Sequence, residues 1–158
     1  MDILGLTQAH LGIVIPSKSQ IKKPLYSFKE KKEILLHRLV SPTGKIKYKR
    51  LVTSPIRYAG GKSLAVGHII ELLPDNTKKL ISPFFGGGSI EIACSKYLDI
   101  EVIGYDIFDI LVNYWTMQIN HPQELFRLLS EYRPTKEEYR KIKDELKKHW
   151  KKEWPGKG

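Results

Sequence analysis

A glycine triplet and an aspartate twenty residues beyond its first member are the residues of this sequence best suited to chemistry. The segment Pro83–Ser89 (PFFGGGS) follows a short apolar stretch and precedes a helical pattern. Glycines in such a turn let the backbone approach a ligand at a helix N-terminus. Asp106 ends the next apolar stretch, where a carboxylate can accept hydrogen bonds from both ribose hydroxyls of a nucleoside. The pair indicates a nucleotide-type site, and the alternative is that Asp106 only caps the helix that follows.

Two better-known nucleotide motifs are not met. Gly86 and Gly88 fit the first two glycines of G-x-G-x-x-G, but the third position is Glu91, which disfavours a dinucleotide-dependent dehydrogenase. The run Gly60–Ser63 (GGKS) ends like a phosphate-binding P-loop, but that motif needs glycine at the position of Ile56. The sequence therefore does not indicate ATP hydrolysis. The GGKS run could simply be a turn before a helix.

The surrounding pattern predicts the elements that position these residues. We expect helices at about 64–73, 89–98, 108–119, 122–132 and 136–150, and strands at 45–52, 80–85 and 101–106. Strand and helix in alternation from residue 80 predict a parallel α/β unit. The 45–52 strand would place Lys45, Lys47 and Lys49 on one face. Residues 13–35 are typical of an extended arm or an added lobe, and Trp115 and Phe126 are expected in the core.

The charge balance points to an acidic partner. The 158 residues include 27 Lys and Arg against 17 Asp and Glu, a net charge of +10. Residues 1–62 carry 13 basic against 3 acidic side chains and residues 134–158 carry 9 against 5, whereas residues 63–133 carry 5 against 9. Such basic flanks are either solvated surfaces or a phosphate-binding footprint. Nucleic acid is the first candidate partner and a membrane surface the second.

Cysteine and histidine usage gives further expectations. The lone Cys94 cannot form an internal disulfide, and no stretch approaches the length of a membrane span, so we expect no membrane partner and a cytoplasmic location. The five histidines show no metal-ligand spacing with Cys94, so no metal site is expected. Cys94 itself is expected to be a small buried core residue.

Three segments, in this order and spacing, resemble the Dam-type DNA adenine methyltransferases: Arg57–Lys62 (RYAGGK), Pro83–Ser89 (PFFGGGS) and Tyr105–Trp115 (YDIFDILVNYW). Lys136–Ile142 is also similar to the helix that begins this family's target-recognition insert. The resemblance covers residues 54–145. Such enzymes transfer a methyl group from S-adenosylmethionine to the exocyclic amine of adenine in double-stranded DNA.

The resemblance implies an α/β fold: a partial Rossmann-like, S-adenosylmethionine-dependent methyltransferase sheet with a basic N-terminal arm and the start of a helical target-recognition region. The implied domains are 1–52, 53–133 and 134–158. It places Tyr58 and Lys62 beside the cofactor and Asp106 on its ribose hydroxyls. The full set of implied cofactor-binding residues is Tyr58, Lys62, Phe84, Phe85, Gly86, Gly87, Gly88, Asp106 and Ile107.

One motif of that family is missing. Neither Asp-Pro-Pro nor Asn-Pro-Pro occurs in the sequence, and the family's D-P-P-Y motif holds the flipped adenine, so no catalytic residue is assigned here. We therefore expect the cofactor-binding portion or subunit of a site-specific DNA adenine methyltransferase, of the kind found in restriction-modification. Its catalytic half would come from a partner polypeptide or a missing C-terminal part, and Lys45, Lys47 and Lys49 would contact DNA. The alternative is a non-catalytic nucleic-acid-binding or regulatory protein that retains a partial methyltransferase fold.

Overall fold

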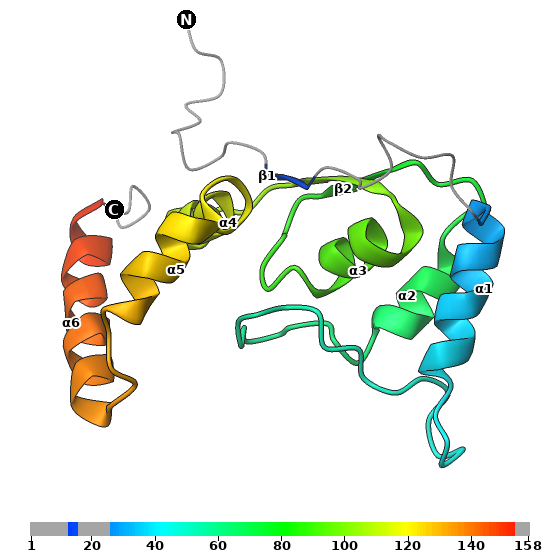
Figure 1. Cartoon of the computed structure of the whole chain (residues 1–158), viewed down its shortest axis with the longest axis horizontal. Helices are drawn as coiled ribbons and strands as arrows, with labels where there is room; N and C mark the ends of the chain where they lie inside the picture. The colour runs from blue at the N-terminus through cyan, green and yellow to red at the C-terminus, as the bar shows by residue number, and fades with distance from the viewer. Residues whose placement is uncertain (1–12, 16–25, 154–158) are drawn as a thin grey trace, which may run out of the picture. The chain divides into compact units, whose positions relative to one another are not determined.

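A computed structural model describes residues 13–15 and 26–153 of the chain. They divide into two compact units with the boundary between Ile119 and Asn120. In chain order the elements are β1 (Ile13–Ile15), α1 (Phe28–Leu39), α2 (Val66–Leu72), β2 (Lys79–Ser82), α3 (Ser89–Leu98), β3 (Glu101–Gly104), α4 (Asp109–Asn120), α5 (Pro122–Ser130) and α6 (Lys136–Glu153) (Figure 1).

The first unit contains a small sheet with the strand order β1-β3-β2. β2 and β3 are parallel, with Leu80 opposite Val102, and α3 makes the crossover between them. This confirms the predicted strand-helix-strand unit, although both strands end before residues 85 and 106. β1, which the sequence did not predict, pairs antiparallel with β3 and places Val14 opposite Ile103. β3 is therefore the central strand, and β2 forms one edge.

The core of the first unit lies where α3 packs against the two parallel strands. α2 and α1 pack in turn on α3 and on each other (Figure 1). The least exposed apolar side chains come from α2, α3 and the β3 region: Val66, Ile70, Ala93, Cys94, Ile100 and Val102. The prediction of a buried Cys94 is confirmed. Burial raises the pKa of its thiol to about 12, so the thiol stays protonated at neutral pH.

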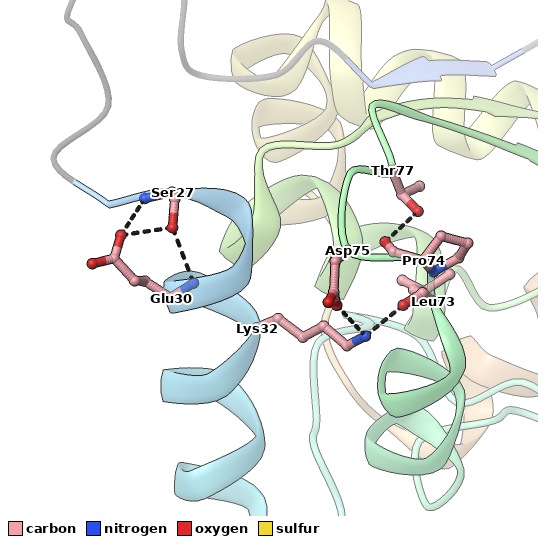
Figure 2. A network of polar contacts seen from close by, with 7 residues as sticks. All are labelled: Ser27, Glu30, Lys32, Leu73, Pro74, Asp75 and Thr77. Atoms are coloured by element: carbon pink, nitrogen blue, oxygen red, sulfur yellow. Dashed lines mark hydrogen bonds and ion pairs between the residues drawn. The ribbon is translucent and has the colours of Figure 1, made fainter.

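Helix α1 shares this core although it lies in the segment expected to be a basic arm. It begins with a capping box, in which Ser27 and Glu30 each bond the other's backbone N–H. Leu35 and Leu39 face inward and are buried. The ammonium of Lys32 donates to the carbonyl of Leu73 after α2 and lies 3.1 Å from a carboxylate oxygen of Asp75, as Figure 2 shows. Apolar burial and this polar link together fix α1 to α2.

The predicted strand at 45–52 is wrong. Residues 41–49 form a loop in which Val40 and Tyr48 make an isolated bridge, and the N–H of Ser41 donates to the carbonyl of Lys47 at 3.0 Å. No other strand lies beside this loop among the described residues, so the alternating pattern has nothing to pair with. Within 45–52 only Tyr48 is buried, because its ring packs on Gly67 of α2. Lys45, Lys47 and Lys49 therefore lie on an exposed loop and share no strand face.

The second unit consists of α5 and α6. Pro122 is the first residue of α5, as predicted. Thr135 precedes α6, and its hydroxyl accepts a hydrogen bond from the N–H of Glu138 at 3.2 Å. The expectation that Phe126 is a core residue is wrong, because its side chain is 74% exposed. Trp115, in the first unit, is buried as expected. None of the helices in the described ranges is both long and apolar enough to cross a membrane.

We expect Gly104→Ala to destabilise the first unit by about 3 kcal/mol, because overpacking a well-filled core displaces its neighbours. A Cβ at Gly104 would lie 2.0 Å from Cδ2 of Phe85, whose side chain is only 2% exposed. Urea denaturation of the full chain measures the change. The control is Gly44→Ala, where φ is +67° but nothing lies within 4 Å, so only backbone strain of about 1 kcal/mol is expected. An equal or smaller loss for Gly104→Ala would contradict this account of the packing.

Candidate functional site

The glycine loop connects the end of β2 to the start of α3. The carbonyl of Phe85 accepts a hydrogen bond from the N–H of Gly88 at 2.9 Å, which closes a tight turn. Gly86 and Gly88 have φ values of +51° and +65°, a region that strains residues with side chains. Gly88 is also the N-cap of α3. The loop therefore delivers glycine backbone to a helix N-terminus, the geometry that the sequence predicted.

Asp106 binds this loop directly. Its side chain is 8% exposed; Oδ2 accepts a hydrogen bond from the N–H of Gly86 at 2.7 Å, and Oδ1 accepts one from the N–H of Phe108 at 3.0 Å. The bond to Phe108 is the local contact expected if Asp106 only caps the helix that follows it. The bond to Gly86 instead joins two residues that are 20 positions apart in the sequence. Each carboxylate oxygen can accept a further hydrogen bond, so the two contacts leave acceptor capacity at Asp106.

Tyr58 covers the other side of the loop. A Cβ at Gly87 would lie 2.9 Å from Cβ of Tyr58, and one at Gly86 would lie 3.1 Å from Cε1 of the same ring. The segment before Tyr58 contains no strand. A hydrogen bond links it to α3, because the hydroxyl of Thr53 donates to the carbonyl of Ser89 at 2.8 Å. A Cβ at Gly87 would be too close to Tyr58 without a shift of the chain, and one at Gly86 would push the ring by a few tenths of an ångström, so glycine at both positions permits this close approach.

The remaining predicted site residues lie at different depths. Lys62 is exposed, and its ammonium donates to the carbonyl of Gly60 at 2.7 Å, with no ion-pair partner among the described residues. Phe84 and Ile107, which flank the loop and Asp106 in sequence, are 85% and 64% exposed. Phe85 is buried under Gly88 and Gly104 instead of lying at the surface. It supports the loop from within.

Sequence reasoning missed two residues that contact this region. The indole Nε1–H of Trp115 donates to the carbonyl of Gly86 at 3.0 Å, whereas the sequence indicated only a core tryptophan. Glu91, in the first turn of α3, is buried and accepts a hydrogen bond from the hydroxyl of Ser82 at 2.6 Å. Burial raises the pKa of Glu91 above its ordinary value. Its only sequence signal was that it occupies a position where a dinucleotide motif has glycine.

Metal chemistry finds no support in the part of the chain that the structure describes. There, no group of three or more His, Cys, Asp or Glu side chains is arranged to hold a metal ion. The polar atoms at the loop are instead backbone amides and carbonyls, the carboxylate of Asp106 and the indole N–H of Trp115.

The family of D12 class N6 adenine-specific DNA methyltransferases matches residues 58–153, more than half of the chain. The chain therefore belongs to this family, and the resemblance to Dam-type enzymes is confirmed. The matched range starts at Tyr58 and includes the glycine loop and Asp106, whereas β1 and α1 precede it. No curated protein and no solved structure gives a significant match.

We expect Glu91→Gln to become more stable relative to the wild type as pH rises from 4 to 8. The pKa of Glu91 is raised in the fold, so its stabilising contribution is complete below the unfolded pKa and is lost as pH rises through the folded pKa. Glutamine never ionises and keeps an oxygen that can accept from Ser82. Urea denaturation at several pH values measures the difference in unfolding free energy.

Glu71→Gln is the control with the opposite sign. The hydrogen bond from Lys47 lowers the pKa of Glu71 in the folded state. The wild type therefore gains stability as pH rises to the unfolded pKa and above, so the Glu71→Gln variant should become less stable relative to the wild type as pH rises. A pH-independent difference for Glu91→Gln would contradict the assigned burial of this carboxyl group.

Proposed function

We propose that this chain is the cofactor-binding portion of a DNA adenine methyltransferase that uses S-adenosylmethionine and acts on the exocyclic amine of adenine in duplex DNA. The observation that carries the proposal is the assembly around the glycine loop. Tyr58 packs against Gly86 and Gly87, and Asp106 accepts the N–H of Gly86. Residues from three separate sequence motifs thus meet at one turn inside one compact unit, as a shared ligand site requires.

The residues fit the chemistry of this cofactor. S-adenosylmethionine, when bound, supplies an electrophilic methyl group on a positively charged sulfur. Lys62 carries an ammonium suited to the carboxylate of the methionine part, and the remaining lone pairs of Asp106 suit the ribose hydroxyls. Phe84 and Ile107 offer exposed apolar surface for the adenine ring. We assign the sheet to a partial Rossmann-like arrangement, with its ligand at the carboxyl ends of β2 and β3.

The catalytic pocket for the flipped base would be supplied by residues beyond this sequence, either in a second polypeptide or in a further part of the same enzyme. An enzyme that modifies a base within a duplex takes that base out of the stack into a pocket, and the D-P-P-Y motif that forms it in this family is absent here. The open edge of β2 supports this assignment. In the described residues β2 pairs only with β3, and Ile81 at this edge is 62% exposed. Such an edge readily pairs with another strand.

A non-catalytic nucleic-acid-binding role is the second candidate. It is favoured by Asp106, because both of its oxygens already accept backbone N–H groups and so have a structural role without any ligand. The basic flanks of the sequence would suffice for such a role. Cofactor binding separates the two candidates, since only the methyltransferase needs it.

We expect the full chain to bind S-adenosylmethionine weakly, because the catalytic strand would supply the second wall of the site. Asp106→Ala should weaken this binding by about 10- to 150-fold, since a carboxylate that accepts two ribose hydroxyls contributes about 1.5–3 kcal/mol in total through charge-assisted hydrogen bonds. Calorimetry of the full chain provides the affinities, and thermal melting verifies that each variant is folded. Asp109→Ala is the matched control, because within the described part of the chain its carboxylate bonds only the N–H of Ile110 in the first turn of α4. Normal binding by a destabilised Asp106→Ala variant would favour the structural role alone.

We also propose that the exposed loop at 41–49 contacts the DNA backbone. Lys45 and Lys49 are exposed, whereas Lys47 forms an ion pair with Glu71 that raises the pKa of its ammonium group. Replacing all three lysines by glutamine should flatten the slope of log affinity against log salt by about 2 to 3, because each neutralised phosphate contributes about 0.9. Matched and mismatched DNA should be weakened equally.

Fluorescence anisotropy with a labelled duplex at several salt concentrations measures this slope. The control removes the same number of exposed charges elsewhere, with the variant Lys29, Lys78 and Lys96 to glutamine. An unchanged slope for the loop variant, or an equal change for the control, would contradict backbone contact by this loop.

A further inference from the structure

Trp115 links helix α4 to the glycine loop through a single buried hydrogen bond. Its side chain is 2% exposed, and its Nε1–H donates to the carbonyl of Gly86 at 3.0 Å. The indole also packs edge-on against the ring of Phe85, with 5.2 Å between the centroids. A Cβ at Gly88 would lie 3.2 Å from Cζ2 of the indole. Trp115 thus touches the loop at both of its left-handed glycines.

The two peptide groups flanking the α-carbon of Gly86 are held by two different side chains. The amide N–H of Gly86, which belongs to the preceding peptide, donates to Asp106 at 2.7 Å. The carbonyl of Gly86, which belongs to the following peptide, accepts from Trp115. Because a peptide group is planar, one hydrogen bond to each group restricts its rotation. The orientation of the Gly86–Gly87 peptide therefore depends on the indole N–H.

This orientation determines where the next donor points. The described peptide bonds include no cis form, and in a trans peptide the carbonyl and the N–H point in opposite directions. Since the carbonyl of Gly86 is turned toward the buried indole, the N–H of Gly87 is turned away from it. Among the described residues this N–H has no hydrogen-bond partner. A buried backbone donor without a partner is costly, and a bound acceptor would satisfy it.

We propose that Trp115 is a positioning residue that holds the Gly86–Gly87 peptide so that the Gly87 N–H donates to an acceptor atom of the bound cofactor. The inference rests on the proposed function, because it takes the ligand of this loop to be S-adenosylmethionine. The proposal gives Trp115 a role in addition to packing, namely the orientation of one peptide group. Phenylalanine could fill much of the same apolar space, but only tryptophan supplies an N–H donor at this point.

The test compares Trp115→Phe with Tyr114→Phe in the full chain. Trp115→Phe keeps an aromatic ring next to Phe85 and removes the donor. Tyr114 is the adjacent residue on α4, and its hydroxyl lies 3.4 Å from Gln118 of the same helix, so its loss leaves the loop bonds intact. Calorimetry with S-adenosylhomocysteine measures affinity, and hydrogen exchange of the unliganded chain measures protection of residues 84–89. Urea denaturation identifies conditions in which all proteins are folded.

We expect Trp115→Phe to bind S-adenosylhomocysteine about five- to tenfold more weakly, because one neutral hydrogen bond is lost and a buried carbonyl is left unpaired. Exchange at residues 84–89 should accelerate in this variant, while Tyr114→Phe matches the wild type in both measurements. If Trp115→Phe does not fold, site-specific replacement of Trp115 by β-(3-benzothienyl)alanine removes the donor with almost no change of ring size, and the same result is expected.

Three outcomes would overturn the inference. If the wild type binds S-adenosylhomocysteine and the variant without the indole donor binds it equally well, the role of Trp115 is contradicted but the proposed function is not. An equal loss in Tyr114→Phe attributes the effect to α4 in general. A wild-type chain that does not bind S-adenosylhomocysteine at millimolar concentration contradicts the proposed function, and the inference fails with it.

Discussion

The hydrogen bond from the N–H of Gly86 to the carboxylate of Asp106 is the interaction on which the site depends. It joins the loop after β2 to the segment after β3, where Asp106 lies two positions beyond the last strand residue, so the segments after the two parallel strands are directly linked. Trp115 adds a second bond to the same glycine from α4, and Tyr58 covers the loop from the segment before α2. The left-handed turn at Gly86 is thus stabilised from three directions. A backbone in a sparsely populated conformation persists only when its surroundings restrain it in this way.

Segments that precede the family match contribute to the same unit. β1 covers the outer edge of β3, and α1 buries Leu35 and Leu39 against α2 and α3. Among the described strands β1 and β2 form the two edges of the sheet, and the glycine loop continues from β2. A further strand added beside β2 would therefore lie next to the glycine loop. This adjacency supports the proposal that a further strand, carrying the catalytic motif, pairs with β2.

Local patterns in the sequence predicted the α/β unit and assigned the glycine loop and Asp106 to one nucleotide-type site, but they did not predict the direct hydrogen bond between the two. A strand-end acid and a strand-end glycine turn on parallel neighbours must converge, so their proximity follows from strand order. The predicted strand at 45–52 is wrong because a strand needs a partner, and Tyr48 is the one residue of that segment that is fully buried, against Gly67. The hydrogen bond of Trp115 could not be predicted from the sequence either, because no spacing rule indicates which carbonyl a buried indole N–H will bond. Tertiary contacts decided both cases.

Amide chemical-shift mapping of the full ¹⁵N-labelled chain during titration with S-adenosylhomocysteine tests the central claim most directly, because it detects weak binding and locates it. The account predicts that the largest shifts fall on Gly86 to Ser89, with further shifts at Tyr58 and at Asp106, while the amides of the 41–49 loop stay unchanged. Absence of shifts at millimolar ligand, or shifts confined to residues outside the three motif segments, would contradict a cofactor site at the glycine loop.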